Sequence, residues 1–108
     1  MTPNEYQQEA LRTANLSLQG YDNLVIGALG LCGESGEVAD HVKKFLGQGH
    51  DLDRDHVIEE CGDVLWYVSL TLKAVGCDME TCMQRNIAKL RRRYPDGFDE
   101  LHSINREV

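Results

Sequence analysis

The stretch from Val64 to Leu72, VLWYVSLTL, is apolar almost all the way around a helix, and it constrains the fold more than any other segment. A helix that is apolar on every side must also be buried on every side. The chain has only 108 residues, which is enough for one domain but too few to surround such a helix completely. The sequence therefore predicts self-association, as a homodimer or a larger assembly, that buries the rest of this helix.

Helical periodicity dominates the chain, and the alternation typical of β-strands is nearly absent. We expect an all-α, four-helix bundle-like fold that forms a single domain over residues 1–108. The four helices are predicted at residues 3–18, 22–46, 54–75 and 79–93, with Thr2 and Asp78 as N-caps and Gly20 and Gly76 as C-terminal stops. The tail from about residue 95 is polar and is expected to be loosely held.

The predicted second helix contains an unusual number of glycines, each of which costs about 1 kcal/mol relative to alanine inside a helix. They are Gly27, Gly30, Gly33 and Gly36. Two interpretations remain open at this point. Some of these glycines let a neighbouring backbone approach while others leave room for a ligand, or the helix begins later, near Gly30.

Composition excludes several classes of protein. The formal net charge of −7 disfavours a general nucleic-acid binder, which needs a basic surface. No apolar run is long enough to span a membrane, and the N-terminus lacks a signal-peptide pattern, so a cytoplasmic location is expected. In that compartment the four cysteines are expected to be reduced structural thiols, and they form no CxxC motif.

Two pairs of carboxylates at helical spacing are the main functional signal: Glu34-x-x-Glu37 and Glu60-x-x-Asp63. Residues three apart lie on one face of a helix, so the two carboxylates of each pair lie close together on the same side. Both pairs are set among glycines and apolar residues, where an unpaired carboxylate is costly. A hard divalent cation is the natural counter-charge for carboxylate oxygens. The pattern predicts a metal-dependent enzyme that acts on phosphates.

Basic and polar residues at helical spacing accompany the acids. On the helical wheel His41 and Lys44 share the face of the first acid pair, and Tyr67 shares the face of the second. The predicted fourth helix presents a strip of three residues, Asn86, Lys89 and Arg93. Such groups beside a bound metal suit a polyphosphate. Arginines near a helix C-terminus also complement the helix dipole, so the strip alone is ambiguous.

At these residues the chain resembles the MazG-type nucleotide pyrophosphohydrolases of the all-α NTP pyrophosphatase superfamily. The family signature is ExxE followed, after a spacer, by ExxD, and here 22 residues separate Glu37 from Glu60. The surrounding segments GLCGESGEVADHVKK and EECGDVLWYV are close to the sequences usual in the family at these positions. NIAKLRRRYPDGF is similar to its C-terminal segment, and NEYQQEALRT resembles small phage and bacterial members. The likeness covers nearly the whole chain.

The resemblance implies a helical dimer or tetramer that uses Mg²⁺, with Mn²⁺ as a substitute. It implies hydrolysis of a (deoxy)nucleoside triphosphate between the α and β phosphates, which gives the monophosphate and pyrophosphate. One glutamate of the first pair, Glu37 in preference to Glu34, would orient or deprotonate the attacking water. The implied metal ligands are Glu34, Glu37, Glu60 and Asp63. The implied substrate-binding residues are Lys44, Tyr67, Asn86, Lys89 and Arg93, with those of the fourth helix reaching phosphate or sugar from either subunit.

Three rival interpretations remain. A di-iron bundle would need Glu-x-x-His motifs, which the sequence lacks. A non-catalytic helical dimer that binds a nucleotide or a partner protein would also explain the apolar third helix, although all four acids are intact. A pyrophosphohydrolase of the same fold that acts on another substrate, such as phosphoribosyl-ATP, would share the acids.

Overall fold

The computed structural model describes residues 1–105, and its regular elements are all helical. They follow in the order α1 (Pro3–Ala10), the 3-10 turn η1 (Leu11–Thr13), α2 (Asp22–Gly47), α3 (Arg54–Ala74), α4 (Met79–Arg93) and α5 (Glu100–Ile104). Since no strand forms in this part of the chain, the predicted all-α class is confirmed. None of the helices described here is both long and apolar enough to cross a bilayer.

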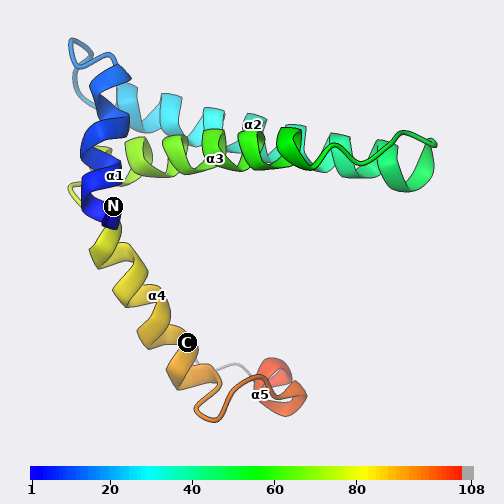
Figure 1. Cartoon of the computed structure of the whole chain (residues 1–108). Helices are drawn as coiled ribbons and strands as arrows, with labels where there is room; N and C mark the ends of the chain where they lie inside the picture. Colours follow the sequence, from blue (N-terminus) through cyan, green and yellow to red (C-terminus); the bar gives the residue numbers. More distant parts are fainter. Residues whose placement is uncertain (106–108) are drawn as a thin grey trace.

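The helices form a hairpin with a diverging arm (Figure 1). The long helices α2 and α3 lie side by side and antiparallel, and α1 crosses the end of this hairpin where α2 begins and α3 ends. From that corner α4 runs away from the hairpin and leads to the short α5. Within one chain, therefore, the four predicted helices do not close into a bundle.

The boundaries of α2, α3 and α4 agree with the predicted ones to within a residue, because local signals determine them. Asp53 and Asp78 cap α3 and α4 by accepting backbone N–H groups at 3.1 and 2.7 Å. Gly76, at φ +75°, stops α3 in the left-handed conformation that glycine adopts without strain. Since α2 begins at Asp22, the alternative start near Gly30 is wrong.

The first helix is shorter than predicted, because it ends at Ala10 rather than at residue 18. The Ala10 carbonyl accepts hydrogen bonds from the Trp66 indole at 2.9 Å and the Thr13 hydroxyl at 2.8 Å. The Ala14 N–H bonds instead to Leu11, three residues back, so the chain tightens into a 3-10 turn. A contact with α3, remote in sequence, therefore ends this helix.

The glycines of α2 separate into two groups. A Cβ at Gly27 would overlap Thr71, and a Cβ at Gly30 would overlap the ring of Tyr67, so these two let α3 approach closely. No atom lies within 4 Å of where a Cβ would stand at Gly33 or Gly36. Gly27 and Gly30 therefore let a neighbouring helix approach, as one of the two interpretations of the glycine pattern predicts. Gly33 and Gly36, which have open space around them, lie beside the acidic residues.

The single chain leaves much of its apolar surface exposed. Its radius of gyration is 16.9 Å, whereas a compact chain of this length has a value of about 13 Å. The large hydrophobic side chains buried within residues 1–105 are Leu11, Leu70 and Met79. Leu65, in the segment that is apolar all round, stays 46% exposed. A single copy of the chain therefore does not bury the apolar surface of α3 that the sequence predicts to be buried.

Candidate metal and substrate site

Three carboxylates from two helices meet on the face where α2 packs against α3. Oxygen atoms of Glu34 and Glu37, one turn apart on α2, and of Glu60 on α3 all lie within 4.8 Å of one another. Glu34 is half-buried, Glu37 is exposed, and Glu60 is buried at 7% exposure. The close approach at Gly27 and Gly30 brings the two helices near enough for the acid pairs to meet. Such a group of carboxylates suits a hard divalent cation.

The electrostatics of the cluster fit a cation. The pKa of Glu34 is raised above its usual range, first by hydrogen-bonding contact with the Glu60 carboxyl and then by burial and the charges of Asp63, Glu60 and Glu37. One Glu60 oxygen, Oε2, is buried with no hydrogen-bond partner among the described residues. A buried carboxylate oxygen without a donor is costly. A cation bound there would offset both the repulsion and the missing partner.

Asp63 lies beside this cluster, outside the group of three oxygens that meet. It is exposed, and it lines a hollow of about 340 Å³ with Glu34, Trp66 and Tyr67. The two aromatic rings are 5.0 Å apart and nearly perpendicular. The Trp66 indole is tied to the end of α1 through its hydrogen bond to Ala10, so this wall of the hollow is held in place.

A second hollow, of about 400 Å³, opens toward the tip of the hairpin. Glu37 and Lys44 line it, together with His41 and His56 and the two glycines that have open space around them, Gly33 and Gly36. The Lys44 ammonium pairs with Asp40 at 2.9 Å, which lowers the pKa of that carboxyl. Lys44 is therefore on the same face as the acids, as the helical wheel predicts.

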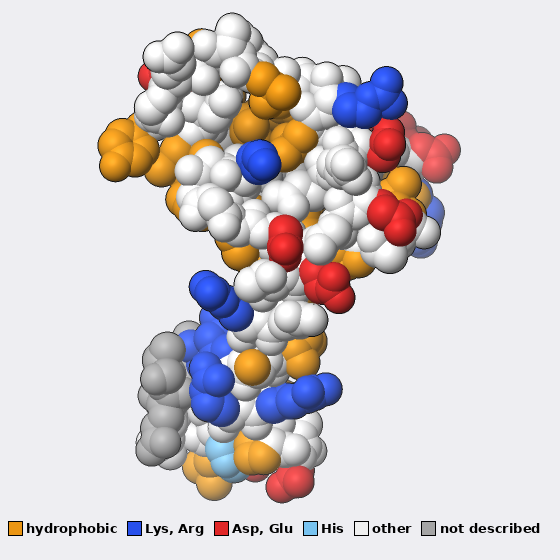
Figure 2. Space-filling view, turned by 90° about the vertical axis from the view of Figure 1, so that its left-hand side faces the viewer, with side chains coloured by type: hydrophobic (Ala, Val, Ile, Leu, Met, Phe, Trp, Pro, Cys, Tyr) orange, Lys and Arg blue, Asp and Glu red, His pale blue; other side chains and the backbone are white. Residues whose placement is uncertain are grey.

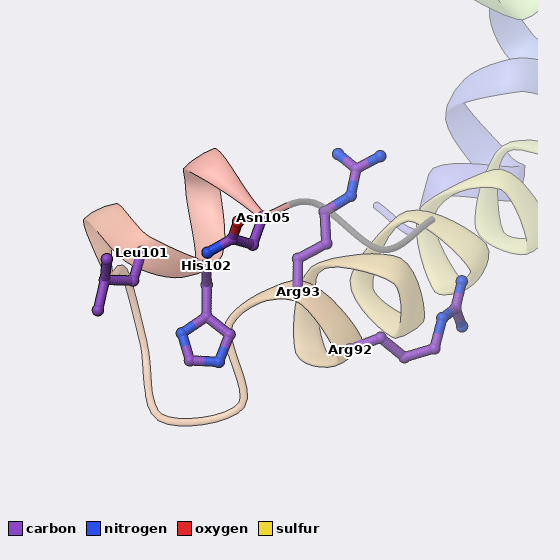
Figure 3. A pocket seen from close by; sticks show the side chains of 5 residues that line it. All are labelled: Arg92, Arg93, Leu101, His102 and Asn105. Carbon is purple, nitrogen blue, oxygen red and sulfur yellow. The ribbon is translucent and has the colours of Figure 1, made fainter.

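The strip of Asn86, Lys89 and Arg93 is not brought to the acids within one chain, because α4 diverges from the hairpin (Figure 1). Basic side chains gather along this arm (Figure 2). Arg93 lines a hollow of about 380 Å³ between α4 and α5, with Arg92, His102 and Asn105 (Figure 3). The Arg93 Nε is buried without a partner among residues 1–105.

Sequence reasoning missed two residues at this site. His56 lies four residues before Glu60, with its Nε2 3.4 Å from Glu60 Oε1. Trp66 forms a wall of the aromatic hollow, next to Tyr67. The i, i+4 spacing of His56 and Glu60 was the available signal for the first. For Trp66 the sequence offered no distinctive signal, because it falls in a run of apolar residues.

Comparison with known proteins places these residues in context. Residues 27–98 match the model of the MazG nucleotide pyrophosphohydrolase domain, a range that includes all four predicted acids. The "Gene 37 protein" of Mycobacterium phage L5 is 37% identical over 82 residues, which cover 72% of this chain and 72% of that protein. No solved structure matches the chain.

Proposed function

Since the chain belongs to the MazG nucleotide pyrophosphohydrolase family, we propose that it hydrolyses (deoxy)nucleoside triphosphates between the α and β phosphates. The products are the nucleoside monophosphate and pyrophosphate. The meeting of Glu34, Glu37 and Glu60 oxygens within 4.8 Å is the observation that carries this proposal. A bound cation would offset the repulsion among these three acids, and it would also let a triphosphate approach them.

The acids of both pairs hold Mg²⁺ in this proposal, and Mn²⁺ substitutes for it. When bound by these residues, such a cation would supply positive charge beside the phosphates and would lower the pKa of water. Glu37 orients or deprotonates the attacking water, in preference to Glu34. Two features support this choice: Glu37 is the exposed member of the cluster, and it lines the open hollow toward the hairpin tip. A general base must lie within reach of the water that it deprotonates.

The two hollows on either side of the cluster suggest how the substrate lies. The sugar or base packs against Tyr67 in the aromatic hollow, where Asp63 is also exposed. Lys44 contacts phosphate from the opposite hollow. The Gly30 backbone supports this arrangement, because it leaves the space that the Tyr67 ring occupies.

We further propose a homodimer or homotetramer in which the strip of Asn86, Lys89 and Arg93 contacts phosphate or sugar at the partner's acids. Two observations support this arrangement. The α2–α3 hairpin leaves large apolar side chains such as Leu29 and Leu46 exposed at 69% and 84%. The α4 helix carries five basic residues against one acid, which complements the acidic remainder of the chain.

A product assay tests the activity. Purified protein is incubated with a panel of ribo- and deoxyribonucleoside triphosphates and Mg²⁺, with and without EDTA. We expect monophosphate and pyrophosphate, and we expect EDTA to abolish both. Diphosphate and phosphate as products would mean that another bond is cleaved. No turnover of any triphosphate would contradict the proposal, and phosphoribosyl-ATP is then the next substrate to assay.

Mixed oligomers test the shared site. Glu37→Gln removes the proposed base and Lys89→Ala removes the proposed phosphate contact, so each homo-oligomer is expected to be inactive. Co-expressed with different tags and purified through both, a mixed dimer contains one intact site of two and is expected to recover about half of the wild-type rate.

The control pairs Glu37→Gln with Glu60→Gln. Both lesions lie on the hairpin, so no intact acid cluster forms in any mixture and no recovery is expected. If the Glu37→Gln and Lys89→Ala mixture recovers no more activity than this control, Lys89 does not act across the interface.

A further inference from the structure

His56 stands one helical turn before Glu60, at the rim of the acidic cluster. Its Nε2 is 3.4 Å from Oε1 of Glu60, and its side chain is 42% exposed while that of Glu60 is 10% exposed. The other Glu60 oxygen, Oε2, is the one that is buried without a partner in the described part of the chain. The imidazole therefore contacts one oxygen of the buried carboxylate and leaves the other free for a different partner.

The backbone of His56 is fixed where α3 begins, and its ring lies beside the ring of His41. The backbone N–H of His56 donates to the Asp53 side chain at 3.1 Å, in the cap that begins α3. The Asp53 N–H in turn donates to Nε2 of His41 on α2 at 3.2 Å. The rings of His41 and His56 are 5.0 Å apart. These contacts link the start of α3, which carries His56, to α2.

His56 is not a member of the group of atoms that could hold the ion. The oxygens of Glu34, Glu37 and Glu60 lie within 4.8 Å of one another, and the imidazole nitrogens fall outside that group. Partners behind a ligating side chain fix its orientation and influence metal affinity strongly. A long, flexible glutamate side chain benefits most from such a partner, because it loses rotamer freedom when it binds an ion.

We propose that His56 is a positioning residue, which holds the Glu60 carboxylate in the orientation that binds the divalent cation. This inference rests on the function proposed above, because it assumes that Glu60 is a metal ligand. The imidazole stands against Oε1, with its Nε2 3.4 Å from that oxygen, and the buried Oε2 is left available to the ion.

The test measures Mn²⁺ binding without nucleotide, by electron paramagnetic resonance, in three variants. His56→Leu is expected to raise the Kd for Mn²⁺ about 10-fold or more, and His56→Gln, which keeps a donor N–H, is expected to stay within about 3-fold of wild type. His50→Leu is the matched control, because His50 is an exposed histidine of the loop between α2 and α3, and it should leave the Kd unchanged.

Kinetics give a second readout. His56→Leu should raise the Mg²⁺ concentration needed for half-maximal turnover while kcat at saturating Mg²⁺ recovers, a pattern that general damage to the fold does not produce. The inference is overturned if His56→Leu binds Mn²⁺ as wild type does, or if His56→Gln is as impaired as His56→Leu. Tight Mn²⁺ binding by a wild-type protein that hydrolyses no nucleotide would contradict the proposed function and leave the role of His56 intact.

Discussion

Hydrolysis is expected to fall at least about 100-fold when Glu37 is replaced by glutamine, because the amide neither accepts a proton from water nor binds a cation as a carboxylate does. Glu37 is exposed on α2, so the substitution leaves no buried group without a partner. The free energy of unfolding should change by less than about 0.5 kcal/mol. The measurement is the initial rate of pyrophosphate release at saturating Mg²⁺, alongside a urea denaturation curve.

The matched control is Glu59→Gln. Glu59 precedes Glu60 on α3 and is exposed, but it is not in the group of carboxylates that meet. The Glu59→Gln variant should therefore retain the wild-type rate.

Asp63→Asn is expected to abolish turnover as Glu37→Gln does, because Asp63 completes the second acid pair. Near-wild-type activity in either Glu37→Gln or Asp63→Asn would remove that residue from the proposed machinery.

Replacing Gln7 by alanine is expected to destabilise the fold by about 2–4 kcal/mol, since three backbone groups lose the side chain that pairs with them in the described part of the chain. The Gln7 amide of α1 donates to the carbonyls of Ser69 and Cys77 at 3.1 and 3.3 Å. Its oxygen accepts the Met79 N–H at 3.0 Å. One buried side chain therefore joins α1 to the end of α3 and the start of α4.

The measurement is urea unfolding followed by circular dichroism at a fixed protein concentration, because association would make stability depend on concentration. Gln8→Ala is the control, since Gln8 is the exposed neighbour on the same helix and should shift stability by less than about 0.5 kcal/mol. A Gln7→Ala variant as stable as Gln8→Ala would show that these three hydrogen bonds contribute little.

Most helix boundaries were predictable because they depend on neighbours in sequence. Asp53, Asp78 and Gly76 act within one turn of the helix ends that they define. The end of α1 was not predictable, because Trp66, 56 residues away from Ala10, takes up the Ala10 carbonyl. The short α5 was not predicted either, although Asp99 caps it by accepting two backbone N–H groups.

By itself the sequence determined the helical class and the pairing of acids three residues apart, since both follow from the period of a helix. Only the tertiary structure decided which acids meet. Close packing at Gly27 and Gly30 sets the separation and rotation of α2 and α3, and it buries Glu60 while leaving Asp63 at the rim. The position of α4 was likewise decided by tertiary contacts at the corner with α1. The periodicity of a sequence indicates which residues share a helix face, but it does not indicate how one helix is oriented against another.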